Sequence, residues 1–220
     1  MGITKAFALS AILLCGLGSA PAQSIQFQAG PDFQEVQASN KVRIDLRYAT
    51  TNNFTGVNLY KDFNRCYLHK LAAQKLQSAI SYLNAAKPGW KLMIFDCLRP
   101  RSVQKLLWQR VVGTPQQPYV ANPAGGSIHN YGFAIDLSLA DENDHEIDMG
   151  TPFDSFLPLA EPAREDEFLK SGRLTSEQIG HRKILRSAME RAGFVQLMNE
   201  WWHYDAFEAR VVRAKYRIVE

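Results

Sequence analysis

The sequence predicts a protein of the α+β class. Apolar residues recur every three to four positions over residues 68–86, 102–112 and 175–192, which is the spacing of amphipathic helices. Residues 133–139 instead alternate between large apolar side chains and small or polar ones, which is typical of a half-buried strand. A chain of 220 residues is long enough to bury one substantial core, so we expect a single domain.

The first 22 residues have the features of an export signal. Lys5 gives a positive start, residues 6–18 are mostly apolar or small, and Ala20-Pro-Ala22 suits signal cleavage. The apolar part is shorter than the roughly 20 residues that span a bilayer. We therefore expect a signal peptide at 1–22, a mature domain at 23–220, export to the periplasm, and no stable membrane anchor after cleavage. The sequence does not predict the oligomeric state.

The net charge and the cysteine content indicate which partners and which cellular compartment to expect. The net charge is only +3 and the basic residues are scattered among acidic ones, so nucleic acid is not an expected partner. Loss of the signal would remove Cys15 and leave Cys66 and Cys97. In an oxidising compartment we expect these two to form a disulfide, and two buried free thiols are the alternative.

The first half of the mature chain contains a loop-like arm, two strands and two helices. We expect the arm over 27–40, a short strand over 42–46 and a loop over 47–56. A helix over 68–86 follows, stopped by Lys87-Pro-Gly. Its apolar stripe comprises Leu68, Leu71, Ala72, Leu76, Ile80 and Leu83.

A predicted strand over 90–95 ends shortly before Arg99, because Pro100 cannot continue a ladder. The next helix, over 102–112, should bury Val103, Leu106, Leu107 and Val111. The third helix, over 175–192, begins with a capping box formed by Thr175 and Gln178 and precedes a short strand over 194–197.

The segment from His129 to Asp136 is a candidate for two metal ligands. If extended, its seven steps would cover roughly 23 Å, so both residues can bind one zinc ion only if Asn130-Tyr-Gly132 bends the chain back. Alone, this pair is a weak signal. Without a third ligand, a capping histidine and a hydrogen-bonded aspartate would be the better explanation.

His203 is the candidate third ligand, in the segment Glu200-Trp-Trp-His203. Two imidazoles and a carboxylate, with a position left for water, form the composition of a catalytic zinc site. Glu200 is the candidate general base for that water. In a regular strand Glu200 and His203 would point to opposite faces, so Glu200 must lie on an irregular turn before the strand. Arg99 is the candidate donor to the developing oxyanion, and a surface salt bridge is its alternative role.

Five blocks in order resemble the D-alanyl-D-alanine dipeptidases, the VanX-type zinc peptidases of family M15, which share the hedgehog/D,D-peptidase fold. The first two are Ser127-x-His-x-x-Gly-x-Ala-x-Asp136 and Glu200-Trp-Trp-His203. The others are Asp96-x-x-Arg-Pro100, Met149-Gly-x-x-Phe-Asp154 and Tyr48-Ala-Thr…Asn-Phe-Thr-Gly56. The resemblance runs from about residue 42 to 207. It implies a central, mostly antiparallel sheet with flanking helices.

The same resemblance implies the roles of individual residues. One zinc ion per chain would be held by His129, Asp136 and His203, and Glu200 would pass a proton to the leaving amine. Arg99 would stabilise the tetrahedral intermediate. Asp154 would bind the free amino group of the substrate, and Ser127 would contact its carboxylate end. Asp96 would help to shape the pocket.

The implied substrate is the dipeptide D-Ala-D-Ala, cleaved to two D-alanines by a metal-activated water. Since the chain is expected to be exported, we expect a role in turnover or scavenging of cell-wall peptides. Two alternatives remain open at this point. One is a D,D- or L,D-carboxypeptidase that trims peptidoglycan stems, and the other is a non-catalytic protein that binds wall peptides.

Overall fold

The structure of the protein, a computed structural model, describes residues 27–220. The expected signal peptide at 1–22 lies outside this range. Among the helices of residues 27–220, none combines the length and the apolar character needed to cross a membrane.

A five-stranded sheet forms the centre of the domain, in the order β2-β4-β5-β7-β6. β2 runs parallel to β4, and each other neighbouring pair is antiparallel. The mostly antiparallel sheet implied by the resemblance is therefore confirmed. The strands are β2 (Val42–Ile44), β4 (Lys91–Asp96), β5 (Ala134–Ala140), β7 (His203–Asp205) and β6 (Val195–Gln196).

A second, two-stranded sheet corrects two predictions. β1 (Phe33–Glu35) pairs antiparallel with β3 (Tyr67–His69), so the arm expected to be a loop contains a strand. The first long helix correspondingly begins at Lys70 and not at residue 68. The His69 side chain accepts a hydrogen bond from the backbone N–H of Leu71 and caps this helix.

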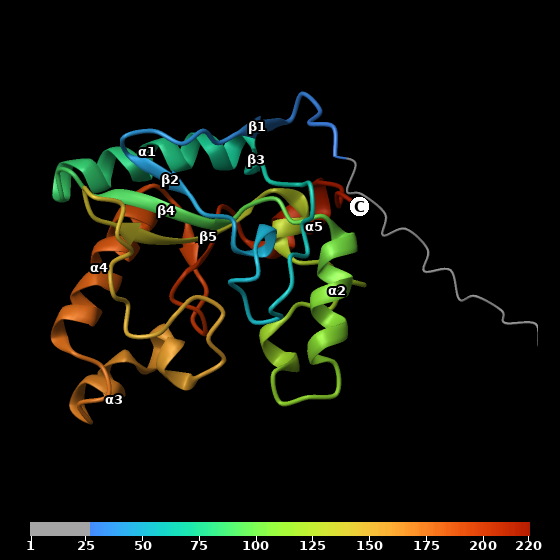
Figure 1. The fold of residues 1–220 in the computed structure, drawn as a ribbon. Coiled ribbons are helices and arrows are strands. Elements are labelled where there is room, and N and C mark those ends of the chain that lie inside the picture. Colours follow the sequence, from blue (N-terminus) through green and yellow to red (C-terminus); the bar gives the residue numbers. More distant parts are fainter. Residues whose placement is uncertain (1–26) are drawn as a thin grey trace, which may run out of the picture.

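Helices pack against the central sheet, as Figure 1 shows. α1 and α4 pack against each other and against β4 and β5, while α2 lies near the other end of β4. The predicted capping box of Thr175 and Gln178 opens α4. Leu71 and Leu106, expected to be buried, are each 39% exposed at the edges of their helices. The helices are α1 (Lys70–Ala86), α2 (Arg101–Val111), α3 (Glu165–Lys170), α4 (Ser176–Arg191) and α5 (Ala209–Lys215).

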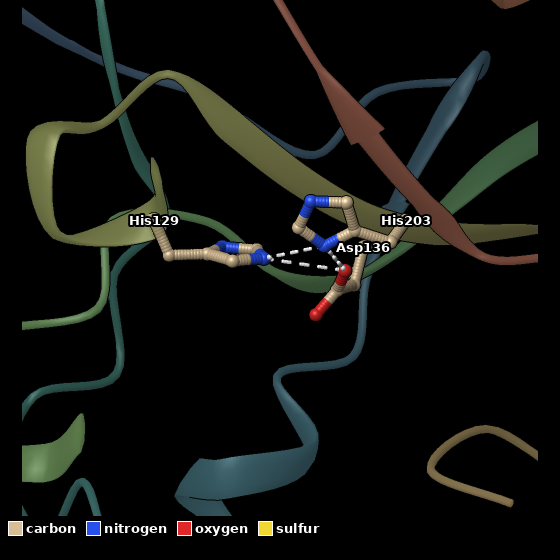
Figure 2. Close-up of side chains that lie close together, drawn as sticks. All are labelled: His129, Asp136 and His203. Carbon is tan, nitrogen blue, oxygen red and sulfur yellow. Dashed lines mark hydrogen bonds and ion pairs between the residues drawn. The ribbon is translucent and has the colours of Figure 1, made fainter. Parts of the chain in front are cut away.

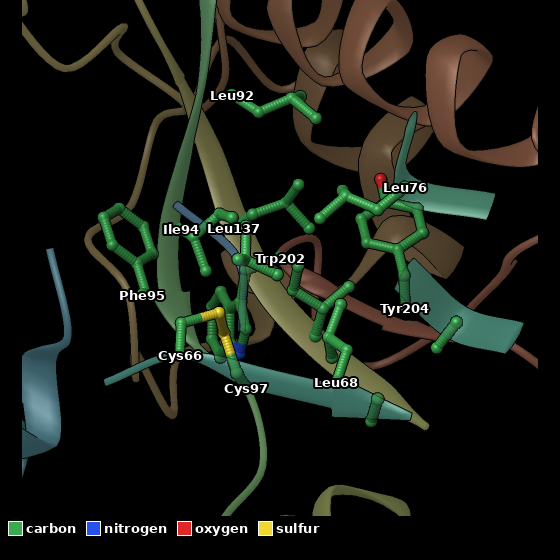
Figure 3. Packing of buried hydrophobic residues seen from close by; sticks show 14 of the residues in the cluster. Cys66, Leu68, Leu76, Leu92, Ile94, Phe95, Cys97, Leu137, Trp202 and Tyr204 are labelled. Atoms are coloured by element: carbon green, nitrogen blue, oxygen red, sulfur yellow. A yellow bond between two sulfur atoms is a disulfide. The ribbon is translucent and has the colours of Figure 1, made fainter. Parts of the chain in front are cut away.

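Both faces of β5 are buried, although its alternating sequence predicted a half-buried strand. On one face Leu137 lies beside Ile94 of β4, in the cluster that includes Leu76 of α1 (Figure 3). Figure 3 also shows Phe95 on the opposite side of β4, where its ring lies 5.1 Å from that of Phe153. A loop that follows β5 thus covers the second face, and this is the face that carries Asp136.

An irregularity in β4 shapes the sheet next to Asp136. Ile94 pairs with Leu137, but the next pair is Asp96 with Asp136, so β4 has one extra residue at Phe95. Such bulges redirect side chains near sites of function. Here the bulge places Asp96 opposite Asp136 in the sheet, where an unbroken register would place Phe95.

Candidate active site

Three side chains from two strands and a short helical turn meet at one end of the central sheet. His129 Nε2, Asp136 Oδ1 and His203 Nδ1 lie 2.9 to 3.2 Å from one another, and all three residues are buried (Figure 2). Asp136 and His203 are direct partners in the β5–β7 ladder. Ligand atoms about 2.0–2.1 Å from a tetrahedral zinc ion lie about 3.3 Å apart, so this triangle has the size of a zinc site.

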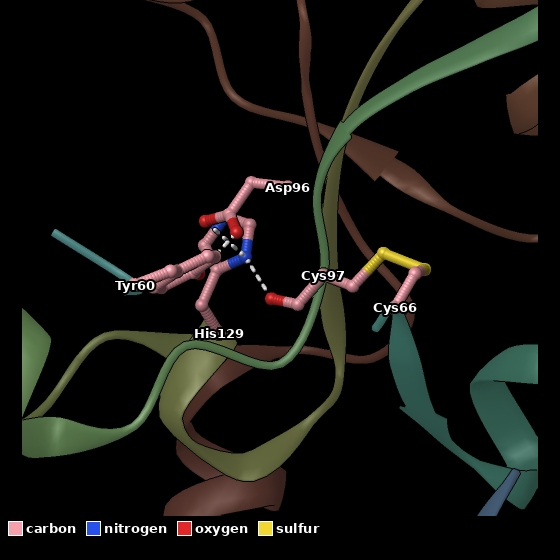
Figure 4. Close-up of a disulfide and its surroundings, with 5 residues drawn as sticks. All are labelled: Tyr60, Cys66, Asp96, Cys97 and His129. Atoms are coloured by element: carbon pink, nitrogen blue, oxygen red, sulfur yellow. Dashed lines mark hydrogen bonds and ion pairs between the residues drawn. A yellow bond between two sulfur atoms is a disulfide. The ribbon is translucent and has the colours of Figure 1, made fainter. Parts of the chain in front are cut away.

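The contacts behind the two imidazoles allow the facing nitrogens to be the unprotonated ones when a metal is bound. Nδ1 of His129 donates to the backbone carbonyl of Cys97 across 2.7 Å (Figure 4), and Nε2 of His203 donates to Asp205 Oδ1 across 3.0 Å. In the neutral rings, Nε2 of His129 and Nδ1 of His203 then present lone pairs to each other and to Asp136. In the metal-free protein a proton on Nδ1 of His203 can bridge to Asp136 Oδ1, which lies 2.9 Å away, and a bound cation would take the place of this proton. The donor set therefore fits zinc.

The bend that brings His129 to Asp136 has the predicted form. Residues Ile128–Tyr131 make a turn of 3-10 helix, which Ser127 caps through its side chain and which ends at Gly132. Gly132 has a φ of 73°, and a Cβ there would lie 2.7 Å from the ring of Phe33. A residue other than glycine would be strained and crowded at this position.

Glu200 lies on the turn before β7, as its candidate role required. Its Oε2 is 4.0 Å from Nδ1 of His203. Burial is the main cause that raises the pKa of the Glu200 carboxyl, to about 7. A carboxyl group with this pKa can both accept and release a proton near neutral pH.

Arg99 is buried beside the cluster and is not a surface salt bridge. Its Nε and Nη2 atoms donate to Asp96 at 2.8 and 2.7 Å, its Nη1 donates to Gln104 at 2.9 Å, and its Nη2 lies 3.4 Å from Asp136. Asp96 is fully buried and also accepts a short hydrogen bond from the hydroxyl of Tyr60. The β4 bulge thus places the carboxylate that orients Arg99 opposite Asp136 in the sheet.

Asp154 is held in an unusual backbone conformation, with a φ of 61°. Its Oδ1 accepts a 2.8 Å hydrogen bond from the hydroxyl of Tyr48. Burial raises the pKa of the Asp154 carboxyl to about 8, although the Tyr48 hydrogen bond acts in the opposite direction. A cationic group beside this carboxyl would favour its ionised form.

The candidate residues share one cavity of about 320 Å³. This volume is at the lower end of the range for small-molecule sites. Asp96 does not line the cavity and lies behind Arg99 and His129. The candidate residues that do line it are Arg99, Ser127, His129, Asp136, Asp154, Glu200 and His203.

Three residues of the site carried no role in the sequence prediction. Tyr48 was within a recognised block, but nothing in it indicated a contact with Asp154. Gln104 is a buried helical residue that contacts Arg99 only through the tertiary fold. Asp205 had a usable signal, because it lies two positions after His203 on the same strand and therefore on the same face.

The predicted disulfide is present. Cys66 and Cys97 are bonded, with their Cα atoms 5.4 Å apart, and they join the start of β3 to the residue after β4. This residue is also the one whose carbonyl oxygen holds His129 (Figure 4).

Sequence comparisons agree with the site in pointing to one class of metal-dependent peptidases. The profile of the family described as D-ala-D-ala dipeptidase matches residues 31–219, so the chain belongs to this peptidase family, M15. The chain is similar to three proteins named D-alanyl-D-alanine dipeptidase. That of Escherichia coli K12 is 35% identical over 76% of this chain and 80% of the relative. The protein of Enterococcus faecalis is 32% identical over 76% of this chain and 87% of the relative. The protein of Enterococcus faecium is 31% identical over 74% of this chain and 85% of the relative.

Proposed function

We propose that the protein is a zinc-dependent dipeptidase that hydrolyses D-Ala-D-Ala to two D-alanines. The triangle of His129 Nε2, Asp136 Oδ1 and His203 Nδ1, with Glu200 beside it in a small cavity, supports this proposal most directly. The names of the similar proteins supply the substrate.

These three ligand atoms would hold one zinc ion per chain, which would polarise the scissile carbonyl and lower the pKa of a water molecule toward neutrality. Glu200 Oε2 accepts a proton from the attacking water. Glu200 then gives this proton to the nitrogen of the leaving D-alanine as the peptide bond breaks. In the metal-free protein burial raises the pKa of Glu200 to about 7, and a zinc ion beside it would favour the ionised form that accepts this proton.

Arg99 acts as an electrostatic group at the same end of the cavity. Its guanidinium is fixed by Asp96 and Gln104, so it needs no reorganisation when negative charge develops on the carbonyl oxygen. A fixed donor of this kind typically contributes a factor of about 10² to 10³ in rate.

Asp154 is proposed to bind the ammonium group of the dipeptide. The carboxyl of the half-buried Asp154 accepts hydrogen bonds from the hydroxyl of Tyr48 and the backbone N–H of Phe54, and an incoming ammonium group would supply the opposite charge. A longer peptide has an amide in place of this ammonium group and would leave Asp154 without its counter-charge. A free amino terminus is therefore a requirement for good substrates.

We further propose that the protein is exported and recycles wall-derived D-Ala-D-Ala, in line with the signal-like first 22 residues. A disulfide between Cys66 and Cys97 suits an oxidising compartment. Fractionation of cells that express the full chain tests this localisation: the expected result is mature protein in the periplasmic fraction.

Hydrolysis of D-Ala-D-Ala, compared with that of a stem pentapeptide ending in D-Ala-D-Ala, tests the proposed substrate. We expect the dipeptide to be cleaved and the pentapeptide to be cleaved at least about 100-fold less efficiently, since the longer chain offers no ammonium group to Asp154 and must fit the same small cavity. Cleavage of the pentapeptide alone would identify a carboxypeptidase instead. Binding without cleavage of either would identify a peptide-binding protein.

A further inference from the structure

The cavity is richer in carboxyl groups than in cations. Four acidic side chains line it, from Asp136, Asp154, Glu200 and Asp205, and the only arginines or lysines that line it within residues 27–220 are Arg99 and Arg213. A dipeptide brings its own carboxylate into this surrounding. Without a cationic partner, that carboxylate would lose its hydration and face like charges.

Arg99 is poorly placed to supply this partner. Its three guanidinium nitrogens are all engaged with Asp96, Gln104 or Asp136, and the residue is only 7% exposed. Two carboxylates already balance its charge. We therefore looked to the rest of the cavity wall for a cationic group that can bind the carboxylate of the substrate.

Arg213 has the exposure, the charge and the position that this role requires. Ala209 and Arg213 are four residues apart on α5 and both line the cavity, so one face of this helix forms part of its wall. Nη2 of Arg213 donates to the carbonyl oxygen of Gly126 across 2.9 Å. Among residues 27–220, no carboxylate forms an ion pair with Arg213, and its other N–H donors remain available.

The Gly126 contact also places this guanidinium next to Ser127. Ser127 lines the same cavity and begins the turn that carries His129. α5 packs against this turn. A carboxylate at this point would meet a guanidinium and a hydroxyl together, which is a favourable pair of donors for two carboxylate oxygens.

We propose that Arg213 binds the terminal carboxylate of the substrate and so selects dipeptides with a free carboxyl end. This proposal rests on the proposed dipeptidase function and adds a recognition residue to it. Together with Asp154, it gives each terminus of the dipeptide a partner of opposite charge.

The test compares the binding of D-Ala-D-Ala and of its C-terminal amide by isothermal titration calorimetry. The zinc-loaded full chain carries Glu200→Gln in every sample, so that the peptide is not consumed. In this background we expect Arg213→Gln to weaken D-Ala-D-Ala binding about tenfold or more, because a charge-assisted hydrogen bond is lost. The affinity for the amide should change less than about twofold.

Arg210→Gln is the matched control. Arg210 lies on the same helix, its side chain is 86% exposed, and it pairs with Glu208 outside the cavity. This variant should leave both affinities within about twofold, and Arg213→Lys should retain part of the preference for the acid. Equal effects of Arg213→Gln on acid and amide, or no effect on either, would overturn the proposal. Turnover of D-Ala-D-Ala by the wild-type protein reports separately on the proposed function.

Discussion

The backbone carbonyl of Cys97 accepts a 2.7 Å hydrogen bond from Nδ1 of His129, and the same residue is disulfide-bonded to Cys66. One covalent link therefore fixes the residue that sets the tautomer of a candidate zinc ligand. Leu98 donates its backbone N–H to Tyr67 at 2.9 Å, which ties this segment to β3 a second time.

Removal of the disulfide should weaken zinc binding as well as stability. For the double variant Cys66→Ala/Cys97→Ala, we expect about a tenfold loss of zinc affinity, because partners behind metal ligands contribute about 10- to 100-fold. The free energy of unfolding should fall by about 3 kcal/mol. Titration against a chelating dye measures the affinity, and denaturant unfolding measures the stability.

Leu83→Ala separates these two effects. Leu83 is buried in α1 and does not line the cavity, and its truncation costs about 2 to 5 kcal/mol. This variant should keep the wild-type zinc affinity. If the cysteine variant also keeps it, the disulfide has no role in positioning His129.

Asp205 should support His203 in the same way. Asp205→Ala removes the acceptor of the His203 Nε2 proton, and we expect zinc affinity to fall about 10- to 100-fold. Asp205→Asn retains an oxygen acceptor, so its zinc affinity should fall clearly less than that of Asp205→Ala. Identical zinc affinities for the alanine and asparagine variants would show that this hydrogen bond does not act on the metal.

Glu200→Ala should abolish turnover without removing the metal. General acid–base catalysis contributes about 10² to 10⁴ in rate, so kcat should fall by at least this range. Metal analysis should still find one zinc per chain, since Glu200 is not one of the three clustered ligands. Loss of zinc from this variant would mean that Glu200 is a ligand or is needed for folding.

The raised pKa of Asp154 predicts how pH affects the stability of the metal-free protein. The folded pKa of about 8 lies above the unfolded value of 3.8, so the folded protein binds the proton more tightly between these values. The titration of Asp154 therefore lowers the free energy of unfolding as pH rises from about 4 to 8, by at most about 1.4 kcal/mol per pH unit.

Asp154→Asn removes this contribution. The stability of the variant relative to the wild-type protein should increase between pH 5 and pH 8 in paired denaturant unfolding experiments. The comparison cancels the titration of Glu200, whose pKa is also raised, to the extent that the two sites are independent. A stability difference that stays constant over this range would contradict a raised pKa at Asp154.

The clustering of the three candidate ligands could be predicted because each of them lies in a short local pattern. His129 and Asp136 flank a glycine turn and a strand, and His203 follows an irregular turn, so sequence spacing carries the geometry. The strand β1 could not be predicted, since three residues carry almost no periodicity.

Other features depend on contacts between distant segments. The β4 bulge that brings Asp96 to Asp136 and the contact of Gln104 with Arg99 arise only when helix and sheet meet. The second covered face of β5 has the same origin, because Phe153 reaches it from a later loop. Periodicity describes one element at a time and cannot contain this information.

Metal dependence of D-Ala-D-Ala hydrolysis tests the central claim most directly. Protein dialysed against a chelator is titrated with zinc, and D-alanine release is measured at each step. We predict no release without metal and a linear rise that ends at one zinc ion per chain. Hydrolysis that survives complete metal removal, or no hydrolysis with zinc bound, would contradict the account.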